Sequence, residues 1–265
     1  MSGTTHGEDE KSSPPPPSGP ARIGESEQGT DDNAPAPVAL VTGGTSGIGA
    51  ATARHLIRLG WRLAVTGRST ERLDAFARET EADDTNLLTI AARPSEWDDV
   101  VAAVDLTLAR FGRLDAAIAN AGFTVPGGLQ GGDPTQWKDM VLVNVLGPAL
   151  LAKATQQALA ESRGRLVLIG SIAGQKFAPG SLYSATKFAV TAMAENYRMV
   201  LLHDGIKVTL IAPGAVETDF WASGTPRAEA LLDPQVIAEG IGWVLSQPEQ
   251  VNPSTLVLRP SYQSF

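Results

Sequence analysis

From residue 38 to the C-terminus, short apolar runs alternate with stretches in which apolar residues recur every three or four positions. The apolar runs, each of strand length, are VALVTG (38–43), RLAVTG (62–67), LLTIAA (87–92), LDAAIANAG (114–122), RLVLIGS (165–171), KVTLIAPG (207–214) and STLVLRP (254–260). Helical periodicity separates them, for example over 71–79, 96–112 and 234–247. Strands that are apolar on both faces and joined by helices predict a parallel sheet covered on each side. We therefore expect one doubly wound α/β domain with a parallel seven-stranded sheet over residues 38–265.

Residues 1–37 have a different composition, rich in Ser, Pro, Gly and acidic groups, with SSPPPPSGP at their centre. A segment with so few large apolar side chains does not bury enough surface to offset its ordering entropy, and we expect it to be disordered. It has seven acidic and two basic residues, a net charge of −5 out of −8 for the chain. The remaining −3 leaves the expected domain close to neutral.

Composition narrows the possible functions further. Because the expected domain has no excess of basic residues, it lacks the electrostatic footprint of a nucleic-acid-binding protein. The chain has no cysteine, and its histidines, His6, His55 and His203, are far apart, so no metal site is expected. The longest apolar run, 140–152, is interrupted by polar and helix-breaking residues and is too short to span a bilayer. The tail resembles neither a secretory signal nor a transit peptide, so we expect a cytoplasmic protein.

Spaced glycines follow the first apolar run, in the stretch TGGTSGIG at 42–49. After a first parallel strand, glycines permit a tight turn and let backbone N–H groups approach a pyrophosphate, while the N-terminus of the next helix adds partial positive charge. Gly43, Gly47 and Gly49 are therefore predicted to form a dinucleotide cradle. This spacing alone is a modest signal, because glycine turns that join a strand to a helix are common.

Several later features appear together with this loop. They are NAG at 120–122, Asn144, Ser171, YSATK at 183–187 and PGAVET at 213–218. In this order, the sequence resembles the classical short-chain dehydrogenase/reductase family over nearly all of residues 38–265. The resemblance implies a Rossmann-like fold, a nicotinamide cofactor and the interconversion of a carbonyl and an alcohol by hydride transfer.

The chemistry of the expected catalytic residues follows partly from their spacing. Tyr183 and Lys187 are four residues apart in a helical stretch, so both project from one face. The ammonium, with the positive charge of an oxidised nicotinamide, is expected to lower the pKa of the phenol from about 10 toward neutrality. In the reducing direction, Tyr183 would then protonate the carbonyl oxygen as its general acid. Ser171 ends a strand, where parallel-sheet enzymes bind ligands, and its hydroxyl is placed to hold the substrate oxygen.

The resemblance assigns the remaining roles. Asn144 would anchor a water that relays protons through Lys187, which would also hydrogen-bond the nicotinamide ribose. Each of Asn144, Ser171, Tyr183 and Lys187 also has an ordinary structural interpretation, and it is their order beside a dinucleotide loop that favours catalysis.

The resemblance also implies further cofactor contacts. Asn120, Ala121 and Gly122 would form a floor beneath the adenosine ribose and brace the sheet. Pro213 and Gly214 would border the nicotinamide, with Val216 and Thr218 near the carboxamide and pyrophosphate. The other members of the glycine loop expected to contact the cofactor are Thr42, Thr45, Ser46 and Ile48.

The end of the second strand bears on cofactor choice. Enzymes that use NAD usually have a carboxylate there for the ribose 2′-hydroxyl, whereas an arginine accommodates a 2′-phosphate. Gly67 occupies the expected acidic position and Arg68 follows it, so we expect NADP(H), with NAD(H) as the less favoured alternative. After the third strand, Ala92 and Arg93 replace the acidic residue that most family members carry near adenine, and Arg93 could add to the positive field.

The substrate is less well specified. Residues 219–232 occupy the position of the family's substrate lid and offer Phe220 and Trp221 as apolar walls. This segment has no clear carboxylate- or phosphate-binding group, which favours a neutral carbonyl or alcohol.

Two long helical stretches, 137–160 and 183–202, are apolar around more than one face, so we expect a homodimer or homotetramer. Dehydration or epimerisation at the same site, and a regulatory protein that binds NADP(H) without turnover, remain alternatives. The complete set of proton-transfer residues argues against the regulatory protein.

Overall fold

The computed structural model describes residues 1, 35–80, 85–220 and 231–262. The chain divides into two units, Met1–Pro35 and Ala36–Phe265, and every strand and helix described here lies in the second. Most of the tail that the sequence predicts to be disordered, and Trp221 of the expected lid, lie outside the described residues.

One parallel sheet forms the centre of the second unit. Its strands follow the order β3-β2-β1-β4-β5-β6-β7, and every neighbouring pair is parallel. The strands are β1 (Val38–Thr42), β2 (Arg62–Gly67), β3 (Leu87–Ala91), β4 (Ala116–Ala119), β5 (Arg165–Ile169), β6 (Lys207–Pro213) and β7 (Thr255–Leu258). Each of the seven predicted apolar runs contains one of them. The doubly wound prediction is therefore confirmed.

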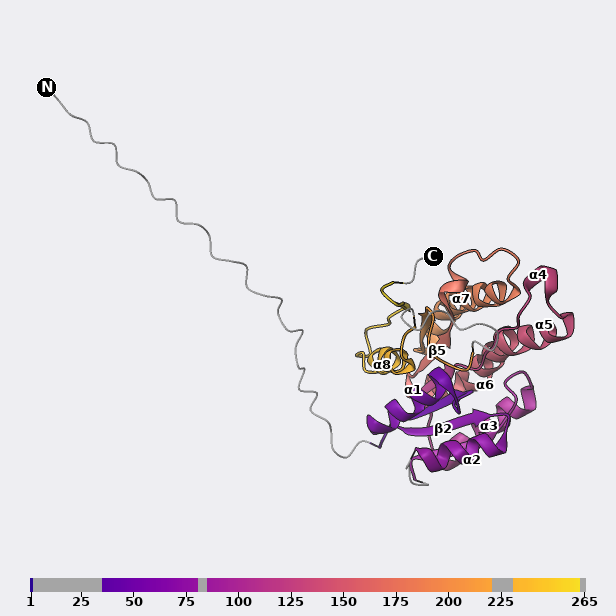
Figure 1. Ribbon diagram of the computed structural model, residues 1–265. Helices are drawn as coiled ribbons and strands as arrows, with labels where there is room; N and C mark the ends of the chain where they lie inside the picture. Colours follow the sequence, from indigo (N-terminus) through magenta and orange to yellow (C-terminus); the bar gives the residue numbers. More distant parts are fainter. Residues whose placement is uncertain (2–34, 81–84, 221–230, 263–265) are drawn as a thin grey trace. The chain divides into compact units, whose positions relative to one another are not determined.

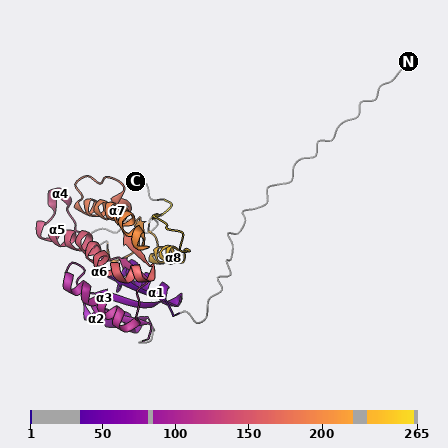
Figure 2. The ribbon, with the colours of Figure 1, turned by 180° about the vertical axis from the view of Figure 1, so that it is seen from behind.

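Helices cover both faces of this sheet, as the two opposite views in Figures 1 and 2 show. Residues of α3 (Trp97–Phe111), α6 (Gly147–Ser162) and α7 (Leu182–Leu201) pack in one apolar core. Those of α1 (Gly47–Arg58), α2 (Thr70–Glu79) and α8 (Pro234–Leu245) pack in the other. Strands β1, β4 and β5 are buried at every position, because they contact both cores.

Two short helices lie between β4 and α6, namely α4 (Gly128–Gly131) and α5 (Pro134–Val141). The stretch expected to be helical over 137–160 is helical throughout, but its hydrogen-bonding pattern changes along the way. Residues Leu142–Leu146 form a π-helical turn, in which the N–H of Gly147 donates to the carbonyl of Leu142. Such turns are rare and often occur at functional sites. Asn144 lies at the centre of this turn.

The parallel sheet brings the predicted site residues to one edge. Because all strands point the same way, the loops that follow β1, β4, β5 and β6 leave the sheet at its carboxyl edge. Those loops hold the glycine cradle, Asn120, Ser171 and Gly214. Residues separated by more than 170 positions in the sequence therefore lie around one site.

Candidate active site

The glycine loop is shaped by close approaches that exclude side chains. Gly43 and Gly47 have positive φ angles of 64° and 50°, which glycine adopts at little cost. A Cβ on Gly43 would lie 3.0 Å from the Cα of Ala121, and one on Gly47 would lie 3.0 Å from the Cγ2 of Thr218. A Cβ on Gly49 would collide with the carbonyl oxygen of Gly43. The loops after β1, β4 and β6 are thus packed against one another.

Asn120 holds this loop to the sheet. Its Nδ2 donates to the carbonyl oxygens of Thr42 and Gly43, both at 3.0 Å. In return, the Oγ1 of Thr42 accepts the backbone N–H groups of Asn120 and Ala121, at 3.1 and 3.2 Å. The brace expected between Asn120 and the sheet is present as this reciprocal set of hydrogen bonds.

The N-terminus of α1 faces the same loop and keeps its donors available. Ser46 is the N-cap, but its side chain makes no capping hydrogen bond, and the first turn contains no acidic residue. Uncapped N–H groups and the helix dipole favour an anion at this position. Together with the side-chain-free cradle, this fits the pyrophosphate of a dinucleotide.

Tyr183, Ser171 and Lys187 lie together where β5 ends and α7 begins. Tyr183 occupies the first turn of α7, and Lys187 follows one turn later, 5% exposed. The Nζ of Lys187 donates to the carbonyl oxygen of Ile169, the last residue of β5, at 2.8 Å, and lies 5.8 Å from the centre of the Tyr183 ring. The hydroxyl of Ser171 interacts by a hydrogen bond with the Tyr183 phenol. The N-terminal turn of α7 thus presents a hydroxyl and an ammonium beside Ser171.

Ser171 is itself fixed by the backbone. It caps a short 3-10 turn, Ile172–Gly174, by accepting the N–H of Ala173 at 3.1 Å. The same turn accepts the hydroxyl proton of Ser184 at the carbonyl of Ala173, 2.6 Å away. The turn after β5 and the start of α7 are therefore joined, which fixes Ser171 relative to Tyr183.

Asn144 is 1% exposed, and its side chain is hydrogen-bonded within the protein. Its Nδ2 donates to the carbonyl of Phe123 and to the Oγ1 of Thr186, and its Oδ1 accepts the N–H of Phe123 at 3.0 Å. A Cβ on Gly122 would lie 3.1 Å from this Oδ1 and 3.6 Å from the Nζ of Lys187. The structure thus brings Asn144, Gly122 and Lys187 together, while the proton relay expected of Asn144 and Lys187 stays a prediction.

The pKa values differ from the simple electrostatic expectation. Desolvation raises the pKa of Tyr183 to about 12, and the hydrogen bond with Ser171 offsets only part of that rise. Burial lowers the pKa of Lys187 to about 8. Burial of both groups therefore opposes the lowering of the Tyr183 pKa that the ammonium is expected to cause. That expectation also includes the positive charge of an oxidised nicotinamide, and it stays a prediction.

The two arginines expected near the cofactor, Arg68 after β2 and Arg93 after β3, differ in their partners. Gly67 is buried, with Thr45 beside it, and Arg68 is exposed and forms no ion pair or hydrogen bond with the described part of the chain. Arg93, in contrast, is bound by Asp99 through a bidentate pair of 2.8 and 3.3 Å. The suggestion that Arg93 adds to the positive field is weakened, because Asp99 neutralises its charge.

The loop after β6 reaches both parts of the site. Pro213 ends the strand, and the N–H of Gly214 donates to the carbonyl of Leu258 at 2.7 Å. Val216 forms a parallel bridge with Leu232, while Thr218 contacts Gly47 of the cradle. The Phe220 ring lies edge-on to Tyr183, 5.4 Å between centres. Of the two expected lid aromatics, Phe220 thus lies beside Tyr183, the expected proton donor.

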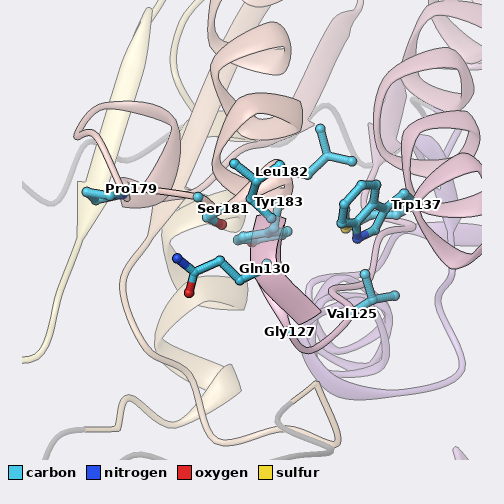
Figure 3. Close-up of a pocket in the computed structure, with 12 residues that line it drawn as sticks. Val125, Gly127, Gln130, Trp137, Pro179, Ser181, Leu182 and Tyr183 are labelled. Carbon is cyan, nitrogen blue, oxygen red and sulfur yellow. The ribbon is translucent and has the colours of Figure 1, made fainter. Parts of the chain in front are cut away.

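The sequence interpretation missed a cavity of about 430 Å³ that includes Tyr183 in its wall. Its other walls come from α4, α5 and the loop before α7, and they include Trp137 (Figure 3). The glycine-rich stretch PGGLQGGD at 126–133 was the available signal, since so many glycines in a short loop indicate close backbone approaches.

Among the described residues, no group of three or more His, Cys, Asp or Glu side chains is placed to hold a metal ion. A search of the described helices likewise finds none that is long and apolar enough to cross a membrane.

Comparison with known proteins points to one family. The short chain dehydrogenase family matches residues 37–228. An uncharacterized oxidoreductase of Staphylococcus aureus is 34% identical over 226 residues, which are 84% of this chain and 96% of the relative. The solved structure of an alcohol dehydrogenase from Thermococcus sibiricus, complexed with 5-hydroxy-NADP, is 31% identical with a TM-score of 0.79. That of a 3-ketoacyl-(acyl-carrier-protein) reductase from Brucella melitensis, complexed with NADH, is 26% identical with a TM-score of 0.79.

Each of these two structural alignments covers 86% of this chain and 98% of the other protein. The family match spans most of the second unit, including the glycine loop, Asn144, Ser171, Tyr183 and Lys187. The chain belongs to the short-chain dehydrogenase/reductase family of oxidoreductases.

Proposed function

We propose that this protein is an NADP(H)-dependent oxidoreductase that interconverts a neutral ketone or aldehyde and the corresponding alcohol. The observation that carries the proposal is the meeting of Tyr183, Ser171 and Lys187 at the carboxyl edge of the sheet, beside a glycine cradle without side chains. A proton donor and a dinucleotide site in one place are what carbonyl reduction requires.

The proposed cofactor residues divide into three groups. Gly43, Gly47, Gly49 and the start of α1 would bind the pyrophosphate, and Asn120 would keep the loop in place. A bound nicotinamide supplies or accepts the hydride. The remaining proposed contacts are made by Thr42, Thr45, Ser46, Ile48, Ala121, Gly122, Pro213, Gly214, Val216 and Thr218.

Tyr183 is the proposed general acid in reduction and general base in oxidation. The hydroxyl of Ser171 would hold the substrate oxygen beside the phenol, so that the proton moves over one hydrogen bond. Because the pKa of the phenol is about 12, the neutral phenol is the dominant form at pH 7 and is ready to donate. Oxidation needs the opposite form, and it requires added positive charge near the ring to reach it.

Lys187 is proposed to bind the ribose and to return the proton to Tyr183. Its ammonium would supply positive charge 5.8 Å from the ring centre. Asn144 lies in the π-helical turn, its side chain hydrogen-bonded to Phe123 and Thr186, and it is proposed to anchor the water that relays protons through Lys187.

Arg68 supports NADP(H) as the cofactor, because its guanidinium at the end of β2 is exposed and has no partner among the described residues, which suits a 2′-phosphate. The Thermococcus sibiricus enzyme, whose structure contains 5-hydroxy-NADP, is consistent with this choice. NAD(H) is the second candidate, favoured by the NADH in the Brucella melitensis structure.

A homodimer or homotetramer is also proposed. Large apolar side chains are exposed near the end of α7, at Met199, Val200 and Leu202, and at Val141 and Leu146 around the π-helical turn. Burial of these side chains against a second copy would remove them from water. Light scattering would give the molar mass that decides this point.

The experiment that tests the function is a panel of neutral and charged ketones, aldehydes and alcohols, followed by the absorbance of NADPH and NADH. The proposal expects reduction of neutral carbonyls with a higher kcat/KM for NADPH. Tight NADPH binding with no turnover on any compound would instead favour the non-enzymatic alternative.

A further inference from the structure

The cavity beside Tyr183 is chemically one-sided. Figure 3 shows the Tyr183 ring between Trp137 and Val125 on one side and Gln130 and Ser181 on the other. The apolar members of the wall are Val125, Leu129, Trp137, Met140, Pro179 and Leu182. Among the residues that the structure describes, no charged side chain lines the cavity. A ligand in this cavity would be uncharged and would place its apolar part away from Gln130.

Trp137 is the largest side chain of the apolar wall, and it lies on α5, one turn before the buried Met140. A tryptophan offers a rigid flat surface on which another ring stacks favourably. The cavity, at about 430 Å³, holds a group of that size. The wall that faces the substrate is thus suited to an aromatic substituent.

Gly132 makes room for the Trp137 indole. Its backbone angles, φ −82° and ψ 153°, suit any residue, so conformational freedom does not explain the glycine. Space explains it, because a Cβ at this position would collide with the Nε1 of Trp137 and lie 2.6 Å from its Cζ2 and from the carbonyl oxygen of Gly128. Any larger residue at 132 would force the indole or the turn to move.

The turn that carries Gly132 is joined to the opposite wall. The N–H of Leu129 donates to the carbonyl oxygen of Gly180 at 2.8 Å, and a Cβ on Gly128 would lie 2.9 Å from the same oxygen. Gly180 lies three residues before Tyr183. The Trp137 wall and the catalytic end of α7 therefore form the two sides of one cavity.

We propose that Trp137 determines substrate specificity, by forming the wall against which an aryl group of an uncharged ketone or aldehyde stacks, and that Gly132 is a positioning residue for its indole. This inference rests on the proposed function, since it assigns the substrate class of the same site. It goes beyond that function because it names the aryl group as the part of the substrate that is recognised and Trp137 as the side chain that recognises it.

A binding experiment tests the proposal without turnover. The dissociation constant of acetophenone is measured by ligand-observed NMR for the NADPH-bound Tyr183→Phe variant. Adding Trp137→Ala should raise this constant about tenfold, because the stacking surface is lost. The matched control is Trp243→Ala, since Trp243 is 51% exposed on α8, outside the cavity, and it should leave the constant within twofold.

The role of Gly132 is tested by a double-mutant cycle. Gly132→Ala should weaken acetophenone binding, whereas the double variant with Trp137→Ala should bind no more weakly than Trp137→Ala alone. NADPH affinity should stay the same in all variants. Additive effects would show that Gly132 does not act through Trp137 and would overturn its positioning role.

Turnover provides the second arm. In the protein with Tyr183 intact, Trp137→Ala should raise the ratio of kcat/KM for 2-acetylnaphthalene over that for acetophenone by at least tenfold, because the lost indole leaves space for a second ring. If ketones are reduced but neither binding nor this ratio changes, the inference is wrong while the proposed function stands. If no carbonyl is reduced, the proposed function fails, and the NMR arm still decides whether Trp137 binds aryl ketones.

Discussion

The two halves of the site are built differently. On the cofactor side, Gly43, Gly47 and Gly49 are in contact with neighbouring loops at distances that leave no room for a Cβ, and Asn120 adds two hydrogen bonds to the same loop. On the substrate side, Gly128 and Gly132 also leave no room for a Cβ, but Gly132 makes room for a side chain, the Trp137 indole. The turn at 127–132 is joined to the loop before α7 by the backbone hydrogen bond from Leu129 to Gly180.

This difference follows from what each half binds. A dinucleotide presents the same pyrophosphate whatever the substrate, so a cradle of backbone N–H groups is sufficient and leaves little freedom in sequence. A substrate cavity is specified by the sizes of its side chains, which change without disturbing the sheet. The cofactor half should therefore be intolerant of small changes, and the substrate half should respond with altered specificity.

The largest expected effect on cofactor binding is that of Gly49→Ala. The added methyl group would collide with the carbonyl of Gly43 and the amide of Asn120, so the loop must move away from its cofactor-binding position. We expect NADPH affinity, measured by fluorescence titration, to fall by about 100-fold or more.

The matched control is Gly60→Ala. Gly60 has a positive φ of 83° at the end of α1, but nothing lies within 4 Å of its Cβ position. This variant should lose roughly 1–2 kcal/mol of stability through backbone strain and keep its NADPH affinity. Equal affinities of both variants for NADPH would show that the tight packing of the cradle is not what binding requires.

The second effect concerns the buried ammonium of Lys187. Because its pKa is lowered from 10.5 to about 8, the folded protein without cofactor binds fewer protons than the unfolded chain between these values. The free energy of unfolding should therefore rise with pH, by roughly 2 kcal/mol between pH 8 and 10 relative to Lys187→Met. Urea titrations at several pH values measure this difference. A difference that stays flat or falls with pH would show that Lys187 is not destabilised by burial.

The smallest effect distinguishes the cofactors. Arg68→Ala should weaken NADPH binding about tenfold and leave NADH binding unchanged, because only the 2′-phosphate loses a partner. Arg93→Ala is the control. Because Asp99 already neutralises Arg93, this variant should change neither dissociation constant by more than about twofold.

Adding Gly67→Asp to Arg68→Ala should then favour NADH, although Thr45 and Leu73 lie 3.2 and 3.3 Å from the Cβ position of Gly67 and must adjust. If Arg68→Ala weakens both cofactors equally, the 2′-phosphate lies elsewhere.

The difference between the cofactor half and the substrate half of the site also explains which features can be predicted from the sequence. The seven strands follow from apolar runs that local pattern defines, and the glycine cradle follows from spacing, because both depend on residues near one another in the chain. The placement of Tyr183 and Lys187 on one face follows from their four-residue separation on one helix. These features are local, and the structure contains the strands, the glycine loop and this pair, whose catalytic roles stay predictions.

The missed features depend on contacts between distant segments. The π-helical turn at Asn144 depends on packing against Phe123 and Thr186, which no helical periodicity reports. The Trp137 wall depends on a glycine five residues earlier and on a loop more than 40 residues later. The high pKa of Tyr183 arises from burial, whereas spacing alone indicates only the nearby cation.

The central claim is that Tyr183 transfers the proton while the cradle binds the cofactor, and Tyr183→Phe separates the two. It removes only the phenolic oxygen, so the fold and the glycine loop should be retained. We expect NADPH affinity within about twofold of the parent and turnover of the best neutral ketone lower by 10²–10⁴-fold, the usual loss on removing a positioned acid. Lys187→Ala, measured beside it, should reduce both quantities. If Tyr183→Phe keeps parental turnover across the pH range, Tyr183 is not the acid and the mechanism is wrong.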